Sequence, residues 1–164
     1  MRGLARLFTG SGRAEEGYVQ YQAKARLYYH SGRYFVTSVA GISEFGEPSV
    51  LEETCENERL GEAVLDHIGR YREDAQEQAG AKLTDWRVYQ LSGARSVKSF
   101  EAEAWHVDLA RMNSAVLVWA RPRVTSRQHL AAYGDCNRND AKAVGEVVRQ
   151  TLDCAAILRD SGAL

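Results

Sequence analysis

The chain has 164 residues, of which 45% are hydrophobic and 26% charged, and its 21 Lys and Arg against 22 Asp and Glu give a net charge of −1. These values are typical of one compact globular domain and exclude a disordered tail, a collagen-like chain and a coiled coil. The near-neutral total also excludes bulk electrostatic attraction to nucleic acids or membranes, so any such attraction must come from a local patch.

The composition gives further expectations about the setting of the protein. The longest apolar run, Ala115–Ala120, is far shorter than the roughly 20 residues that cross a bilayer. Residues 1–16 are interpreted as an irregular segment rather than a signal peptide, because Arg6 interrupts their apolar part. The three cysteines lack Cys-x-x-Cys spacing, which argues against a disulfide framework or a zinc site. We therefore expect a cytoplasmic protein with no metal, no cofactor and no membrane partner.

The first half of the chain predicts a hairpin, an edge segment and a helix. Alternating apolar residues from Val19 to Tyr29, a turn at Ser31-Gly32 and the β-prone run Tyr34–Val39 predict two paired strands. The glycines and proline that follow predict a loop or a short edge strand at residues 41–48. Helical spacing then links Leu60, Val64, Ile68 and Tyr71, with Asn57 as the expected N-cap and Gly80 as the expected stop.

The second half predicts a similar order. Strands are expected at Trp86–Leu91 and Ser99–Leu109, with a β-bulge near Ala104 where the apolar phase changes. A central strand at Ala115–Ala120 ends at Pro122, and a loop at Tyr133–Asn139 precedes a helix spanning Val144–Ala155.

The two predicted helices align residue by residue. Leu60–Ile68 matches Val144–Leu152, with Gly61 opposite Gly145, and the recurring glycine predicts a close approach of each helix to the sheet. The expected fold is α+β, with two pseudo-repeated units of antiparallel sheet plus helix in a single domain at residues 17–164. The repeats are expected at about residues 17–80 and 81–160.

No phosphate-binding loop, nucleophile elbow or metalloprotease helix is present in the sequence. A thiol enzyme requires Cys136 to lie beside His129 or His106, an adjacency that spacing alone does not show. Glu101 and Glu103 lie on one face of the predicted strand and could act in acid-base catalysis, but exposed charges on a strand are the simpler interpretation. We therefore expect no catalytic residues.

Charge is segregated along the chain. Residues 41–80 contain 11 acidic and 3 basic residues, a net charge of −8, so the rest of the chain carries +7. One interpretation is a solvated helix face plus an acidic loop. The other is a surface that attracts a basic protein and imitates a phosphate backbone, with Trp86 or Tyr89 as an aromatic anchor. Its candidate acidic residues are Glu44, Glu47, Glu52, Glu53, Glu56 and Glu58.

A competing hypothesis rests on aromatic residues in the predicted strands. Tyr28, Tyr29, Tyr34, Trp86, Tyr89 and Trp105 are interleaved with Lys24, Arg26, Arg33, Arg87 and Lys98. This mixture is found in sheets that stack bases and hold phosphates, so single-stranded nucleic-acid binding remains the alternative function.

Four short motifs occur in a telling order: Gly32-Arg-Tyr-Phe-Val-Thr-Ser38, Leu60-Gly-Glu-Ala-Val64, Val97-Lys-Ser-Phe100 and Val144-Gly-Glu-Val-Val148. Over about residues 17–156 the chain resembles a family of bacterial contact-dependent growth inhibition immunity proteins. The resemblance implies a Whirly-like, pseudo-symmetric fold and a cytosolic non-enzyme that binds the C-terminal toxin domain of a cognate effector, commonly a nuclease. We expect the toxin to be encoded by the adjacent gene and to be inhibited by occlusion of its active site. An immunity protein of this kind is not expected to bind nucleic acid.

Overall fold

The computed structural model describes residues 22–74, 82–122 and 131–163. The strands are β1 (Ala23–His30), β2 (Arg33–Ala40), β3 (Ser43–Glu52), β4 (Trp105–Met112), β5 (Ala115–Pro122) and β6 (Ala132–Asn137). The helices are α1 (Asn57–Gly69), the 3₁₀ turn η1 (Leu83–Asp85), α2 (Arg87–Ser92), α3 (Val97–Glu103) and α4 (Ala141–Asp160). The predicted N-terminal segment 1–16, the strand start at Val19, the stop at Gly80 and the candidate base His129 lie outside the described residues.

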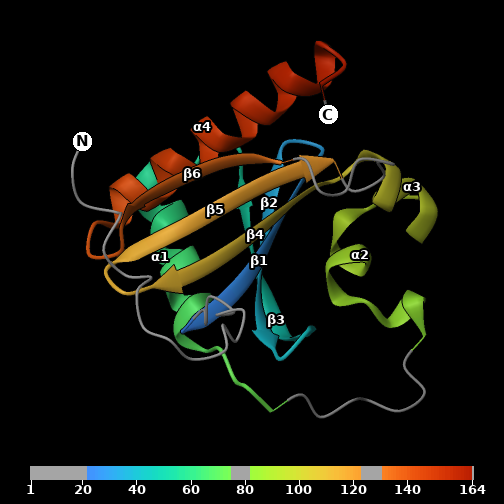
Figure 1. Cartoon of the computed structure of the whole chain (residues 1–164). Coiled ribbons are helices and arrows are strands. Elements are labelled where there is room, and N and C mark those ends of the chain that lie inside the picture. Colours follow the sequence, from blue (N-terminus) through green and yellow to red (C-terminus); the bar gives the residue numbers. More distant parts are fainter. Residues whose placement is uncertain (1–21, 75–81, 123–130, 164) are drawn as a thin grey trace, which may run out of the picture.

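The six strands form one antiparallel sheet in the order β3-β2-β1-β4-β5-β6. Three strands followed by α1 make the first half of the sheet, and three strands followed by α4 make the second half. The halves join where β1 pairs with β4 (Figure 1). The predicted class, an α+β domain of two sheet-plus-helix units, is confirmed.

The two halves are related by a pseudo-two-fold axis between β1 and β4. Ala25 pairs with Leu109 while Leu27 pairs with Val107, a reciprocal register. The turns that follow β1 and β4 also correspond, because Ser31 and Asn113 both adopt left-handed backbone angles, with φ of 50° and 54°. The predicted hairpin turn at Ser31-Gly32 is thereby confirmed, and the paired strands of the two halves correspond residue by residue.

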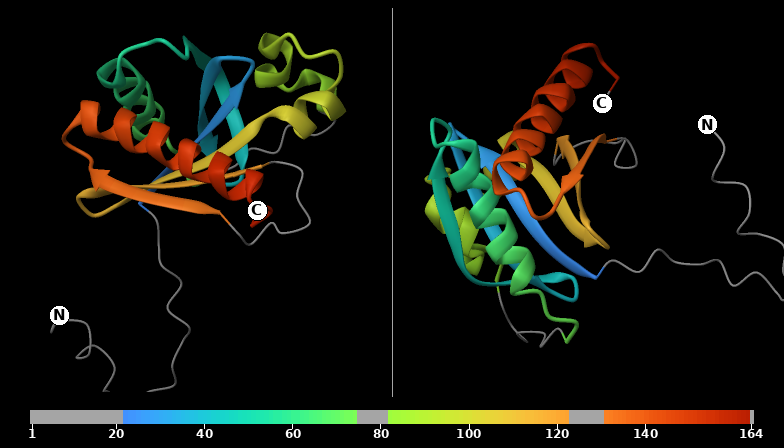
Figure 2. Two further views of the ribbon diagram at one scale, coloured as in Figure 1. Left: turned by 90° about the horizontal axis from the view of Figure 1, so that it is seen from above. Right: turned by 90° about the vertical axis from the view of Figure 1, so that its left-hand side faces the viewer.

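Helices α1 and α4 pack on the same face of the sheet, where they cover the larger core. Figure 2 shows this face in its right-hand panel, with both helices in front of the strands. The helices cross at their matched glycines: a Cβ atom on Gly61 would lie 1.7 Å from the carbonyl oxygen of Ala141, and one on Gly145 would lie 1.9 Å from that of Asn57. The predicted close approach exists, but it is helix against helix rather than helix against sheet.

The residues between the two halves form a helical insert, defined as residues 82–103. It lies on the far side of β1 and β3 from α1 (Figure 1) and builds a second core around Tyr28, Phe35, Val88 and Phe100. The prediction of strands here was wrong: α2 occupies residues 87–92, directly after Trp86, and α3 occupies residues 97–103. The change of apolar phase near Ala104 marks the passage from helix to strand, not a β-bulge.

Three boundaries also differ from prediction. Helix α1 follows Glu56, one residue before the predicted cap, and ends at Gly69, well before Gly80. The segment expected as a loop at 133–139 is largely the edge strand β6. The edge segment after β2 is a full strand whose register shifts around Gly46, which has a φ of 75°. Among the described residues, no helix is both long and apolar enough to cross a membrane.

Candidate partner-binding surface

The acidic residues predicted from the sequence lie near the two ends of β3. Glu44 and Glu47 lie in its first half, which faces the insert. Glu52 ends the strand, and Glu53, Glu56 and Glu58 follow in the connection to α1 and its first turn. We call these last four residues the acidic loop. The structure therefore divides the predicted surface into two separate sites.

Glu44 is an internal anchor of the insert. Its carboxylate accepts hydrogen bonds from the Tyr28 hydroxyl, from Trp86 Nε1 at 2.8 Å and from Arg26 at 3.3 Å. The Trp86 ring lies 5.0 Å from that of Phe100 in the second core. Glu44 and Trp86 were both predicted for the partner-binding surface, and the structure brings them into contact. Their contact holds the insert to the sheet.

Glu47 is exposed and forms a forked ion pair with Arg87 of α2, with distances of 2.8 to 3.1 Å. These hydrogen bonds lower the pKa of the Glu47 carboxyl. A cavity of about 560 Å³ lies between β3 and the insert, and Glu44, Glu47 and Trp86 all line it. Tyr89, the other predicted anchor, is half-buried against the second core.

All four residues of the acidic loop are exposed, and Arg149 of α4 fixes the loop's backbone. The Arg149 guanidinium donates to the Glu53 carbonyl at 2.6 Å, to the Cys55 carbonyl at 2.5 Å and to the Tyr34 hydroxyl at 3.0 Å. Because the cation is bound to backbone oxygens, the loop carboxylates keep their position at the surface. This arrangement presents several negative charges on a fixed piece of chain.

A cavity of about 270 Å³ adjoins the acidic loop, between α4 and the start of β4. Its walls include the rings of Tyr29, Tyr34 and Trp105, so we call it the aromatic pocket; Glu53 and Asp153 also line it. Burial, followed by a hydrogen bond with Glu53, raises the pKa of Tyr29 to about 12, so the phenol is neutral.

The sequence prediction missed the aromatic pocket. Tyr29 and Tyr34 flank the predicted hairpin turn, so that prediction already placed two of the three rings side by side. Trp105 belongs to the same set of aromatic residues in the nucleic-acid hypothesis, but the predicted strand Ser99–Leu109 that carries it is α3 in its first half, and β4 begins at Trp105 itself. Asp153 comes from α4, and only the tertiary fold brings it to this place.

The geometry does not support a thiol enzyme that pairs Cys136 with His106, and the other predicted base, His129, lies outside the described residues. Cys136 packs beside the larger core, whereas His106 stacks on Tyr28 at the opposite face of the sheet. Burial, with Asp135 and Asp140 nearby, raises the pKa of the Cys136 thiol to about 11, which disfavours the nucleophilic thiolate. Within the described ranges, no three His, Cys, Asp or Glu side chains are arranged to hold a metal.

Known structures share this fold. A protein of unknown function from Neisseria meningitidis matches with a TM-score of 0.58 and 13% identity, over 84% of this chain and 98% of that chain. A chain of the CdiA-CT/CdiI toxin and immunity complex from Yersinia pseudotuberculosis matches with a TM-score of 0.57 and 14% identity, over 80% of this chain and 95% of that chain. No family model and no curated protein matches the sequence. The chain therefore has a fold that also occurs in a toxin and immunity complex.

Proposed function

We propose that this protein is an immunity protein that neutralises the C-terminal nuclease domain of a cognate contact-dependent growth inhibition toxin by covering its active site. The observation that carries the proposal is an exposed acidic loop on a fold also found in a chain of a toxin and immunity complex. The ordered motifs that resemble this class of immunity protein add support.

The electrostatics of the acidic loop suit such a partner. A nuclease must hold a phosphate backbone, so its substrate cleft is basic, and exposed carboxylates on a fixed loop are complementary to it. The attraction between opposite charges accelerates the encounter of the two proteins, and added salt weakens this attraction. The proposal therefore predicts fast association that slows as ionic strength rises.

The test uses the protein encoded by the adjacent upstream gene. Its C-terminal domain is co-expressed with the full chain, and complex formation is measured by co-purification and calorimetry. We expect a stable complex and survival of cells that express the toxin domain together with this protein. A toxin domain that neither co-purifies with the chain nor is neutralised by it refutes the proposal.

Single-stranded nucleic-acid binding is a second candidate, favoured by a cavity of about 320 Å³ on the sheet face opposite α1 and α4. Lys24, Arg26, Trp119 and Arg121 line this cavity. It ranks second because Asp108 forms ion pairs with Arg121 at 2.5 Å and with Arg26 at 3.8 Å, which reduces the charge available to phosphate. Oligonucleotide binding that weakens strongly with salt and with Arg121→Glu would favour it over the toxin partner.

A further inference from the structure

We propose that the aromatic pocket receives a lysine or arginine side chain of the toxin, an inference that rests on the proposed function and assigns its principal contact point. The pocket combines an apolar wall with an acidic mouth. Trp105 and Leu152 are almost fully buried, at 9% and 8% exposure, whereas Glu53 and Asp153 are exposed. A long basic side chain has the matching form, with an aliphatic stem and a charged head.

The charges near the mouth select a cation. Glu53 and Asp153 line the pocket itself, and Glu52, Glu56 and Glu58 belong to the same acidic loop. The opposing charges are Arg149 and Arg159. The terminal nitrogens of Arg149 donate to two backbone carbonyls and to the Tyr34 hydroxyl, and Arg159 forms an ion pair with Asp160 at 2.9 Å. The carboxylates of the pocket and of the acidic loop outnumber these two cations, so an arriving basic group meets a net negative charge.

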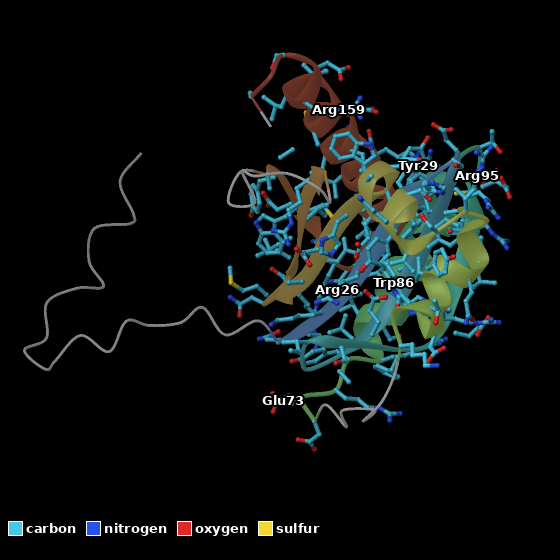
Figure 3. The ribbon with its side chains drawn as sticks, turned by 90° about the vertical axis from the view of Figure 1, so that its right-hand side faces the viewer. Arg26, Tyr29, Glu73, Trp86, Arg95 and Arg159 are labelled. Carbon is cyan, nitrogen blue, oxygen red and sulfur yellow. The ribbon has the colours of Figure 1, made fainter. Side chains whose placement is uncertain are left out.

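The rings of the pocket already attract guanidinium groups within the chain. Arg149 lies 5.1 Å from the centre of the Tyr34 ring, and Arg159 lies 4.9 Å from that of Trp105. Both distances are within the range of cation–π attraction. Figure 3 shows Arg159 and Tyr29 toward the same end of the molecule, where α4 extends past the strands. The aromatic wall is thus chemically suited to a further basic side chain.

The pseudo-symmetry of the fold allows the two ends of the β1–β4 ladder to be compared. Tyr29 and Trp105 are directly paired at one end of the β1–β4 ladder. The two-fold axis relates them to Arg111 and Ala23, which are paired at the other end. One end of the same ladder therefore carries two aromatic residues where the related end carries none, so the aromatic wall is a feature of one half of the fold only.

Exposed apolar surface lies beside the pocket on α4. Ile157 is 68% exposed and follows Asp153 of the pocket wall by one helical turn. Apolar surface beside a charged pocket is the usual composition of a protein interface, in which flanking contacts exclude water from a central anchor. A protein that carries the basic side chain fits the pocket and its apolar surroundings better than a free small cation does.

The test compares two double charge reversals that change the net charge equally. Glu53→Lys with Asp153→Lys alters the pocket, and Glu73→Lys with Asp74→Lys alters exposed acids at a distant place, since Glu73 lies at the opposite end of the molecule (Figure 3). Binding to the toxin domain is measured by calorimetry, and circular dichroism confirms folding. We expect the pocket variant to bind about tenfold more weakly or worse, and the control to lose much less.

The outcomes separate this inference from the proposed function. If the unaltered chain forms no complex, the proposed function fails. If it binds, but the pocket variant binds as tightly or loses no more than the control, the pocket assignment is overturned and the immunity function stands. The milder pair Glu53→Gln with Asp153→Asn guards against misfolding, because it removes the charges without adding opposite ones. Recovery of binding when a toxin lysine or arginine is changed to glutamate, tested on the pocket variant, would identify the inserted residue.

Discussion

Replacement of Gly61 by alanine tests the helix crossing on which both halves of the fold depend. The added Cβ would lie 1.7 Å from the carbonyl oxygen of Ala141 and 3.0 Å from the backbone nitrogen of Gly145, whereas ordinary contact begins at 3.4 Å. Both atoms belong to the backbone of α4, so no side-chain rotation relieves the clash. The two helices must move apart, and the core beneath them must loosen.

Two opposing terms set the size of the effect. Alanine is favoured over glycine inside a helix by about 1 kcal/mol. Overpacking of a rigid core typically costs about 1–3 kcal/mol, and a clash with backbone belongs at the upper end or beyond it. We therefore expect a net loss of about 2 kcal/mol in the free energy of unfolding, which corresponds to a fall of about 4–8 °C in Tm for a domain of this size.

The assay is urea and thermal unfolding followed by circular dichroism, with Gly69→Ala as the matched control. Gly69 ends the same helix and has no atom within 4 Å of the position of an added Cβ. The control should be neutral or slightly stabilising, since it gains helix propensity without a clash. A Gly61→Ala protein as stable as the unaltered chain would show that α1 and α4 do not cross at these glycines.

Three further predictions concern the two cores and the N-cap of α3. Burial, with a smaller contribution from Arg70, lowers the pKa of His67 below its usual value. As the pH falls, the unfolded chain therefore takes up a proton before the folded chain does, and stability is lost. The urea midpoint should decline between about pH 7.5 and about pH 5.5, and it should decline less in His67→Gln. Phe100→Ala should cost about 3–5 kcal/mol in urea unfolding, because the ring is fully buried in the second core. Ser96→Ala should lower the calorimetric Tm by removing about 1 kcal/mol of capping at α3, and an unchanged Tm would refute the cap.

The sequence predicted the two longest helices and the first hairpin because each signal there is local and strong. Val64 and Val148 recur on matched apolar stripes, and Ser31-Gly32 has the composition of a turn with left-handed backbone. The insert was misread because its helices have six and seven residues, too short for helical periodicity to outweigh aromatic and β-branched residues. Two punctuation signals were present: Gly93 at a helix end, with a φ of 74°, and Ser96 with Ser99 as a capping pair.

The candidate site shows a different limit. Counting charge along the chain correctly found an acidic segment, but strand direction decides which acids share a surface. Glu44 turns inward to Trp86, whereas Glu53 stays exposed at the other end of β3. The aromatic pocket joins residues from β1, β2, β4 and α4, and such a meeting depends on the sheet order and on the path of α4. These are tertiary properties that no local pattern contains.

The internal duplication separates the residues that build the fold from those that can recognise a partner. The motifs that resemble immunity proteins fall on scaffold positions: Phe35 and Phe100 are fully buried, and Gly61 and Gly145 form the helix crossing. Buried side chains of this kind cannot distinguish one toxin from another, because they do not reach the surface. If the protein has the proposed function, specificity for one toxin must come from exposed positions, and our candidate is Glu53 at the aromatic pocket. Substitutions at the crossing should therefore change stability, and substitutions at the pocket mouth should change affinity while the unfolding transition stays in place.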